Sequence, residues 1–427
     1  MVLVKMLLAV AVLAMAVTGG LCDPTTDSSG CPVSFREKCR CGLAYSRYDG
    51  FKNKRYTVNC TNTGFASTEM LHDLPENTEV LIFSGNYVPE LPANVLDNLK
   101  DYGDLEAIDM SNNNIRFIQG KTFHKVYSVT TLVLDHNDLE ITDEKERPRI
   151  FSNFEGLERL HLTNAFTEMI NASDYLLSLE DIFYESKLTE LRVLHLEQNE
   201  IWSIGKNQKV FCQLPKLEQV LLGDNRLIDF DFRIDCLPEL QYIDLERNMI
   251  FRLSDEAMTR LDSFSNKKGN TLQINMEENP FSCDCRSKSF IHWLNSTGID
   301  VMHNEVYKCV DGYPTTNIGK KLREVQQLTC PSSASRTSSI SDDVFTEREL
   351  EDFHKTHYDD HHTTGYSSAT IGALSFLLVF TSSLLLAVAY FHRKVLKDLT
   401  SPIWTFITRY VGYTGIADEE TPREVNV

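Results

Sequence analysis

A short pattern of apolar residues and asparagine returns along the middle of this chain, and it limits the possible folds more than any other feature. In its clearest copy, Leu105 to Ile115, apolar residues stand at positions 1, 4, 6 and 11 and asparagine at position 9. An array of amphipathic helices would not keep asparagine at one fixed offset. Eight copies share the frame, beginning at Thr78, Leu105, Val129, Leu157, Leu191, Leu217, Leu240 and Thr271, and those at Thr78, Leu157 and Thr271 are the weaker matches. In the Leu157 copy, Ala165 replaces the asparagine.

Each part of the frame has a physical reason. Apolar residues two positions apart point to the same face of a short strand, so positions 4 and 6 enter one core together. The asparagine amide can satisfy backbone groups where the chain turns away from the strand. One copy cannot bury its apolar face alone, whereas stacked copies bury a continuous core. The frame is that of the leucine-rich repeat and predicts an α/β leucine-rich-repeat solenoid with a horseshoe shape over residues 78–278.

One step of the array is longer than the others. Successive copies begin 27, 24, 28, 34, 26, 23 and 31 residues apart, so the Leu157 copy carries an insertion. We place the insertion at Asn164 to Leu188, with a helix-like stretch from Ser173 to Tyr184. Insertions in solenoids form surface loops on one side, often the binding side. A loop that is merely tolerated is the alternative.

Two apolar segments near the ends of the chain predict how it meets a membrane. Residues 1–22 have one early lysine, a short apolar core and then small residues, as a secretory signal peptide does. Residues 369–391 carry no charge, are long enough to cross a bilayer, and are followed directly by arginine and lysine. Because positive charge stays in the cytoplasm, we expect a single-pass type I plasma-membrane protein with an extracellular N-terminus, one transmembrane helix and a cytoplasmic tail at 392–427.

The charge balance restricts the partners. The chain has 61 Asp and Glu against 42 Lys and Arg, a formal net charge of −19. The tail is balanced, so the part before the predicted span carries the negative excess. This disfavours nucleic acid and anionic lipid, and it favours either a partner with a basic patch or a surface that is only well hydrated.

The cysteines agree with secretion. Ten of the 11 lie between the signal peptide and the predicted span, and Cys22 leaves with the signal. An even set on the oxidising side of the membrane indicates five disulfides. Eight of the ten cysteines define two caps, one at 23–77 and one at 279–330. They are Cys31, Cys39, Cys41, Cys60, Cys283, Cys285, Cys309 and Cys330. Three pairings are open within each group, and the two Cys-x-Cys pairs leave zinc as an alternative.

The remaining two cysteines lie inside the repeats. Cys212 and Cys236 stand at nearly equivalent places before Leu217 and Leu240. Equivalent sites on neighbouring coils can lie within the roughly 4.4–6.8 Å Cα separation that a disulfide needs. We therefore expect a Cys212–Cys236 disulfide.

Other features belong to modification and to the C-terminal part. Asn59, Asn171 and Asn295 each begin an Asn-x-Ser/Thr triplet and are candidate glycan sites, with Asn59 crowded by the adjacent Cys60. Residues 331–368 are acidic and serine-rich with few apolar residues, which predicts a disordered stalk. The histidines of the stalk leave weak zinc or copper binding as an alternative reading.

The tail offers two short motifs. Tyr413 and Ile416 form a Tyr-x-x-apolar signal for an endocytic adaptor. Val425 and Val427 place apolar residues at the end of the chain, which a PDZ protein can capture by adding the peptide as a strand.

Together the caps, repeats and span resemble the trophoblast-glycoprotein-like family within the extracellular leucine-rich-repeat transmembrane proteins. The likeness rests on the insertion, the run 154–157, the cap sequence 279–285 and the inner membrane edge 390–394, whereas the stalk and the final tripeptide differ. The resemblance implies roles in adhesion, motility and restraint of Wnt signalling. It also implies the disulfides Cys31–Cys41, Cys39–Cys60, Cys283–Cys309 and Cys285–Cys330.

A partner would meet the concave side of such a horseshoe, where the side chains at positions 3, 5, 7 and 8 point. Position 5 is occupied in turn by Asp109, Val133, His161, His195, Leu221, Asp244 and Asn275. Acidic residues gather late in the array at positions 7 and 8. We expect an exposed Tyr242–Leu221 pair to anchor the partner, and a solvated face is the alternative. The expected partner-binding residues are His161, His195, Leu221, Tyr242, Asp244 and Glu246.

His161 and His195 invite a catalytic or metal-binding interpretation, but no nucleophile motif accompanies them and the insertion separates their coils in the sequence. We expect no catalytic residue, metal or cofactor. The predicted function is that of a non-enzymatic cell-surface glycoprotein that binds a protein ligand in adhesion or cell–cell recognition. The alternative is a membrane regulator that binds a co-receptor and restrains its signalling, such as the Wnt pathway.

Overall fold

The computed structural model of this protein describes residues 31–35, 38–96, 103–141, 150–167, 172–186, 188–205, 209–268 and 272–330. The chain divides into two units, Met1–Ser333 and Ala334–Val427, and every described residue belongs to the first. The predicted signal peptide, Asn171, stalk, membrane span and tail motifs lie outside the described residues. Within the described part, no helix has the length and apolar character needed to cross a membrane.

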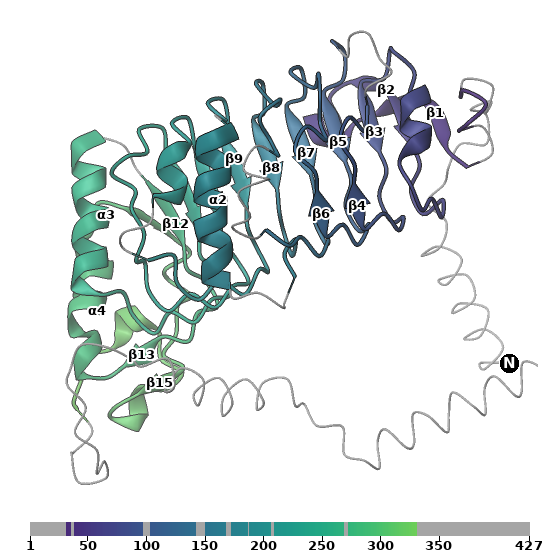
Figure 1. Ribbon diagram of the computed structural model, residues 1–427. Helices are drawn as coiled ribbons and strands as arrows, with labels where there is room; N and C mark the ends of the chain where they lie inside the picture. The colour runs from purple at the N-terminus through teal and green to yellow at the C-terminus, as the bar shows by residue number, and fades with distance from the viewer. Residues whose placement is uncertain are drawn as a thin grey trace, which may run out of the picture. The chain divides into compact units, whose positions relative to one another are not determined.

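One 11-stranded sheet runs through the described unit in the order β1-β2-β3-β5-β7-β8-β9-β10-β11-β12-β14, and Figure 1 shows its strands side by side in a curved array. The pair β1–β2 is antiparallel and each later described pair is parallel. Their bounds are β1 Arg40–Tyr45, β2 Lys54–Asn59, β3 Val80–Ile82, β5 Ala107–Asp109, β7 Thr131–Val133, β8 Arg159–His161, β9 Val193–His195, β10 Gln219–Leu221, β11 Tyr242–Asp244, β12 Gln273–Asn275 and β14 Asp300–Met302.

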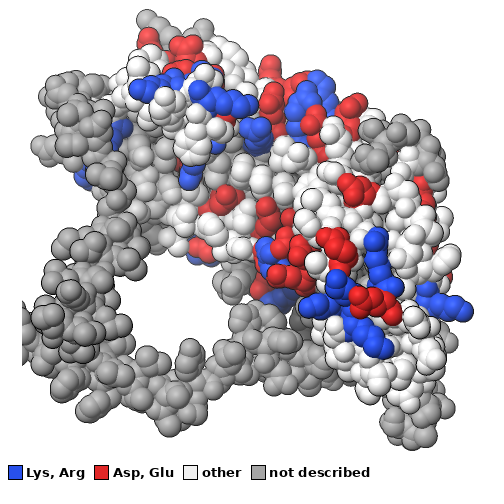
Figure 2. Space-filling model, turned by 180° about the vertical axis from the view of Figure 1, so that it is seen from behind, with Lys and Arg blue, Asp and Glu red and all other residues white. Residues whose placement is uncertain are grey.

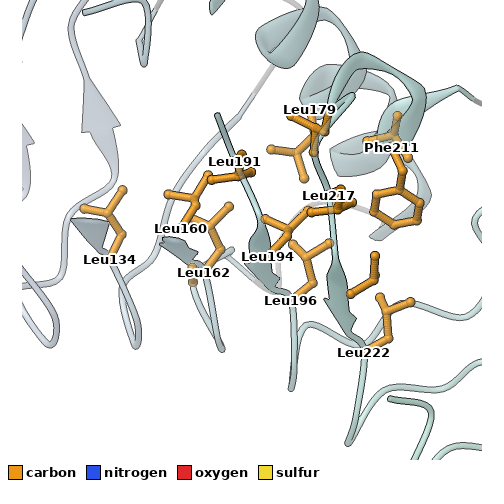
Figure 3. Packing of buried hydrophobic residues seen from close by; sticks show 14 of the residues in the cluster. Leu134, Leu160, Leu162, Leu179, Leu191, Leu194, Leu196, Phe211, Leu217 and Leu222 are labelled. Atoms are coloured by element: carbon orange, nitrogen blue, oxygen red, sulfur yellow. The ribbon is translucent and has the colours of Figure 1, made fainter. Parts of the chain in front are cut away.

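The repeat frame coincides with this sheet. Each of the eight copies contributes one strand at its positions 3 to 5, from β3 to β12. Positions 4 and 6 are fully buried, as Leu194 and Leu196 illustrate at 0% exposure, and Figure 3 shows such leucines from successive coils packed against one another. Burial of each such side chain contributes about 1.5–3 kcal/mol. The predicted leucine-rich-repeat solenoid is confirmed.

The asparagine at position 9 joins each coil to the one before it. The Asn225 side chain is 5% exposed, and its Nδ2 donates to the carbonyls of Leu196 and Leu222, each at 2.9 Å. Its Oδ1 accepts from the backbone N–H of Asn199 and of Ile201, each at 3.0 Å. Asn137 and Asn248 make the same kind of bonds in their own coils. One side chain therefore satisfies buried backbone groups on two coils.

The insertion forms a helix without interrupting the sheet. Helix α2, Ala172–Ser186, buries Leu179 and Phe183, whereas β8 and β9 on either side of the insertion pair directly. Figure 1 shows α2 and α3 beside the strands. The other elements are α3 Asp255–Lys268, α4 Lys288–Ser296, β4 Glu90–Leu91, β6 Phe117–Ile118, β13 Ser282–Cys283, β15 Asp311–Gly312, η2 Arg47–Asp49, η3 Glu69–Asp73, η4 Val210–Gln213, η5 Cys285–Ser287, η6 Thr315–Asn317 and η7 Leu322–Glu324.

Both ends of the core are covered by disulfide-bonded segments. The hairpin β1–β2 extends the sheet at one end, and β14 with α4 covers the other. The described residues hold five disulfides. Cys212–Cys236 is the pair expected from the repeat positions, and Cys31–Cys41, Cys39–Cys60, Cys283–Cys309 and Cys285–Cys330 are the pairs that the family resemblance implies. The Cα atoms of Cys212 and Cys236 lie 5.4 Å apart, so adjacent coils bring the two residues together as their repeat positions require.

Asn225→Ala should lower the free energy of unfolding by about 2–4 kcal/mol, because it leaves buried backbone donors and acceptors of two coils without a partner. Urea unfolding with the disulfides intact measures the change. Asn53→Ala changes an exposed asparagine before β2 and should shift stability by less than about 0.5 kcal/mol. Equal effects of the two substitutions would contradict the role given to Asn225.

Replacing Cys212 and Cys236 together by alanine should cost about 2–4 kcal/mol of stability, since the bridge closes a loop between residues 24 apart in sequence. The difference should vanish when wild type and variant are compared after full reduction. Peptide mapping without reductant that finds both residues as free thiols would refute the bridge itself.

Candidate partner-binding face

One face of the sheet is buried by the core, and the other, which we call the open face, carries the side chains of positions 3 and 5. In β9, β10 and β11 the central residue is buried while the residues on either side are half-buried. The register aligns position 5 across neighbours, with His161 opposite His195, His195 opposite Leu221, and Leu221 opposite Asp244. Tyr242 is the first residue of β11, the strand that also holds Asp244, and Glu246 lies just after the end of that strand. The structure therefore brings the six expected partner-binding residues onto one continuous stretch from β8 to β11.

His161 and His195 lie at the centre of this stretch. Although 34 residues separate their repeats, their strands are adjacent and their rings stack with centroids 3.9 Å apart and planes 11° from parallel. The insertion thus does not separate the two coils in space as it does in the sequence. Burial, and then the charge of His195, lower the pKa of His161 to about 3. His161 is consequently neutral at physiological pH.

Two carboxylates from position 7 border the histidine stack. His195 Nδ1 lies 2.9 Å from Glu197 Oε1, and Thr163 Oγ1 donates to Glu197 Oε2 at 2.9 Å. Burial opposes ionisation of Glu197, but the hydrogen bond and charge of His195 outweigh it and lower the pKa of Glu197. Asp135 Oδ2 lies 3.9 Å from His161 Nδ1, and burial raises the pKa of Asp135. The two stacked imidazole rings therefore lie next to the carboxylates of Glu197 and Asp135.

Asp244 is a third carboxylate on the open face. Its Oδ1 accepts the backbone N–H of Glu246 at 3.0 Å, and the neighbouring Gly223 leaves room for the carboxylate, because a Cβ there would lie 3.3 Å from Asp244 Oδ2. Burial raises the pKa of Asp244 to about 6, and the charge of Glu197 acts in the same direction. The fold keeps this carboxylate where its charge is costly, which is typical of functional sites.

Further along, the acids are joined to arginine. Arg247 forms ion pairs with Asp224, at 2.6 Å, and with Glu246, and Asn275 Nδ2 donates to Glu246 Oε2 at 3.1 Å. Figure 2 shows acidic and basic side chains gathered in mixed groups beside broad uncharged areas. The expected acidic surface toward the C-terminal cap is thus present but partly neutralised.

The structure corrects two expectations about exposure. Leu221 and Tyr242 are both half-buried, so the anchor is not the exposed pair expected from the sequence. Asp109, also at position 5, is 0% exposed because the N-terminal cap covers it. Asp109 pairs with Arg47, and Tyr48 donates its hydroxyl hydrogen to Asp109 Oδ2 at 2.6 Å. The carboxylate of Asp109 is therefore bound by two residues of the N-terminal cap.

No three His, Cys, Asp or Glu side chains within the described ranges are grouped so that they could hold a metal ion. The two glycan triplets in these ranges lie in different settings. Asn59, half-buried on β2, pairs in register with Ile82 at position 5 of the first repeat, and Asn295 is exposed near the end of α4. An Asn59 glycan would therefore border the first strand of the repeats.

Sequence reasoning missed several residues around this face. Asp135, Thr163 and Glu197 all occupy position 7, so extending the frame by one position to every copy would have found them. No such signal marks Arg47 and Tyr48, which lie 62 and 61 residues from Asp109 and outside the repeats.

Comparisons with known proteins place the chain among leucine-rich-repeat proteins. No protein-family model matches it. Trophoblast glycoprotein of Macaca fascicularis is 24% identical over 254 residues, 57% of either chain, and human lumican is 33% identical over 152 residues, 35% of this chain and 39% of lumican. The chain thus spans little more than half the length of the first of these curated relatives.

Among solved structures, the crystal structure of human trophoblast glycoprotein, also named Wnt-activated inhibitory factor 1, superposes with a TM-score of 0.56 at 23% identity. It covers 68% of this chain and 97% of the human one. The chain therefore resembles trophoblast glycoprotein in sequence and shares its leucine-rich-repeat fold.

Asp244→Asn should raise the free energy of unfolding at pH 7.4. Asp244 ionises near pH 6 in the folded chain and near 3.8 in the unfolded one. Above pH 6 both states are charged and the fold bears the full cost of the buried carboxylate; below about 3.8 both are neutral and the cost is gone. Thermal unfolding from pH 3.5 to pH 7.5 should therefore show a gain that grows with pH. Asp104→Asn, at an exposed site, is the control, and a gain independent of pH would be inconsistent with this account.

Proposed function

We propose that this trophoblast-glycoprotein-like chain is a non-enzymatic cell-surface receptor whose open face, from β8 to β11, binds a protein ligand. The observation that carries the proposal is the continuous row of half-buried position-5 side chains, His161, His195, Leu221 and Asp244, bordered by carboxylates. A row of this kind offers ring and aliphatic surface at its centre with charge around it, the composition that partners use as an anchor.

The electrostatics favour a basic surface on the ligand. The charge of Glu197 acts on both Asp135 and Asp244 across the row, and burial raises the pKa of both. A cationic side chain placed among them would relieve this repulsion. Binding would then stabilise the charged form of Asp244, so affinity should depend on that carboxylate more than on freely solvated acids.

Adhesion or cell–cell recognition is the role that we infer for this binding, with the chain held in the plasma membrane by the segment 369–391 and glycosylated outside. A PDZ protein or endocytic adaptor on the tail belongs to the same proposal. The second candidate function is a membrane regulator that restrains co-receptor signalling. What favours it is the likeness to human trophoblast glycoprotein, which also bears the name Wnt-activated inhibitory factor 1.

Cells that display the full chain should aggregate with cells that carry the ligand, and Asp244→Lys with Glu246→Lys should reduce aggregation about tenfold by reversing charge at the row. Glu155→Lys with Glu239→Lys makes the same change in net charge at exposed residues in the turns leading into β8 and β11. This control should aggregate like wild type.

Surface staining confirms equal display of the variants. If both double variants aggregate like wild type, the row is not the binding site. If no partner cell aggregates, and the chain instead changes signalling only in cells that also bear a co-receptor, the regulator replaces adhesion as the function. In that case the same pair of variants, scored by signalling, tests the row again.

A further inference from the structure

The loop of the N-terminal cap bends over the open face, outside the row described above. It leaves β1 and includes η2, and two contacts on its underside reach Asp109 of β5, from Arg47 and from Tyr48. A third contact spans 111 residues of sequence, because Arg159 of β8 donates from Nη1 to the carbonyl of Tyr48 at 3.0 Å. The loop is thereby attached to two strands of the sheet.

A cavity of about 430 Å³ lies between this loop and the sheet. Its floor is built from small side chains at position 3 of three consecutive strands, Val80, Ala107 and Thr131, and Lys52 and Arg159 also line it. These position-3 side chains are short, so space remains between the sheet and the loop beside the loop's contacts with Asp109 and Arg159.

The charges in the cavity lining are not balanced by their own neighbours. The two lining acids have partners: Asp49 accepts the backbone N–H groups of Lys52 and Asn53, and Glu106 lies 3.0 Å from Arg55. Lys52 and Arg159 are exposed, and within the described ranges neither side chain forms an ion pair with a carboxylate. The lining charges that have no ion-pair partner in these ranges, those of Lys52 and Arg159, are therefore positive, in a chain whose net charge is −19.

The lining acids have a different environment. Arg55 is shared by Asp49, Glu79 and Glu106, at 3.8, 2.9 and 3.0 Å, so one cation serves three carboxylates and a second negative group beside them would be repelled. The lining thus combines two cations without an ion-pair partner among the described residues, Lys52 and Arg159, with two acids, Asp49 and Glu106. A ligand with a single carboxylate next to neutral hydrogen-bond donors matches both kinds of charge, whereas a densely anionic ligand matches only one.

We propose that this cavity binds the carboxylate side chain of an aspartate or glutamate in a peptide segment of a protein partner. The guanidinium of Arg159 presents its remaining N–H donors to the carboxylate, and the Lys52 ammonium supplies a second charge. Peptide N–H groups beside the carboxylate donate to the lining acids Asp49 and Glu106. The cavity is separate from the row of His161 to Asp244, so it stands whether or not that row binds a ligand.

The test measures binding of the unlabelled peptide acetyl-Gly-Glu-Gly-Gly-amide to the full chain in detergent micelles by isothermal titration calorimetry. We expect the glutamate peptide to bind with a Kd below about 1 mM and its glutamine analogue to bind at least about tenfold more weakly. Arg159→Gln with Lys52→Gln should weaken the glutamate peptide about tenfold or more, and Arg159→Lys, which keeps the charge, should retain most of the binding. Both sites are exposed, so the fold should survive, as a thermal melt will show.

Arg116→Gln is the matched control, because Arg116 is an exposed arginine that pairs with Glu140 and does not line the cavity. It should leave peptide binding unchanged, as should Asp244→Lys, whose failure in the aggregation assay would concern only the row from His161 to Asp244. The proposal is overturned if the glutamate peptide does not bind below about 1 mM, or if the double variant binds it as wild type does. It is also overturned if a sulfated disaccharide binds more tightly than the peptide, because the ligand would then be a glycan.

Discussion

The buried asparagine at position 9 is the interaction on which the rest of the structure depends. Asn225, for example, accepts from backbone N–H groups of the preceding coil and donates to the carbonyls of Leu196 and Leu222, one on each coil. A shift of one coil against the next by one residue would leave these buried groups without partners, at about 1–3 kcal/mol for each group. The asparagines therefore help to set the register of strand pairing between each coil that carries one and the coil before it.

Register in turn decides which side chains meet on the open face. Since equal repeat positions align from strand to strand, the choice of residue at position 5 in one coil fixes the neighbour of position 5 in the next. His161 stacks on His195 for this reason, and Asp244 lies in the same row as Leu221. Asp135 and Asp244, whose pKa values burial raises, are costly to the fold. Two carboxylates that destabilise the fold on the same surface indicate that this surface has a role in binding.

The N-terminal cap does more than close the core. Its loop covers Asp109 and reaches Arg159, so the first repeats do not offer the same open surface as the later ones. This division leaves two different surfaces on one sheet, an acidic row from β8 to β11 and, under the loop, a cavity whose lining includes the cations Lys52 and Arg159. A single partner with both charges, or two partners, would find separate places to bind.

The sequence by itself determined the solenoid, its caps, the Cys212–Cys236 bridge and which residues share the row, because a repeat frame encodes contacts between equal positions of neighbouring coils. It also marked the insertion as a helix, which α2 confirms. Only the tertiary structure decided that β8 and β9 pair across that insertion, that Leu221 and Tyr242 are half-buried, and that Asp109 is covered. The covering contacts join residues 61 to 111 positions apart and follow no period, so their partners depend on where a loop ends in space.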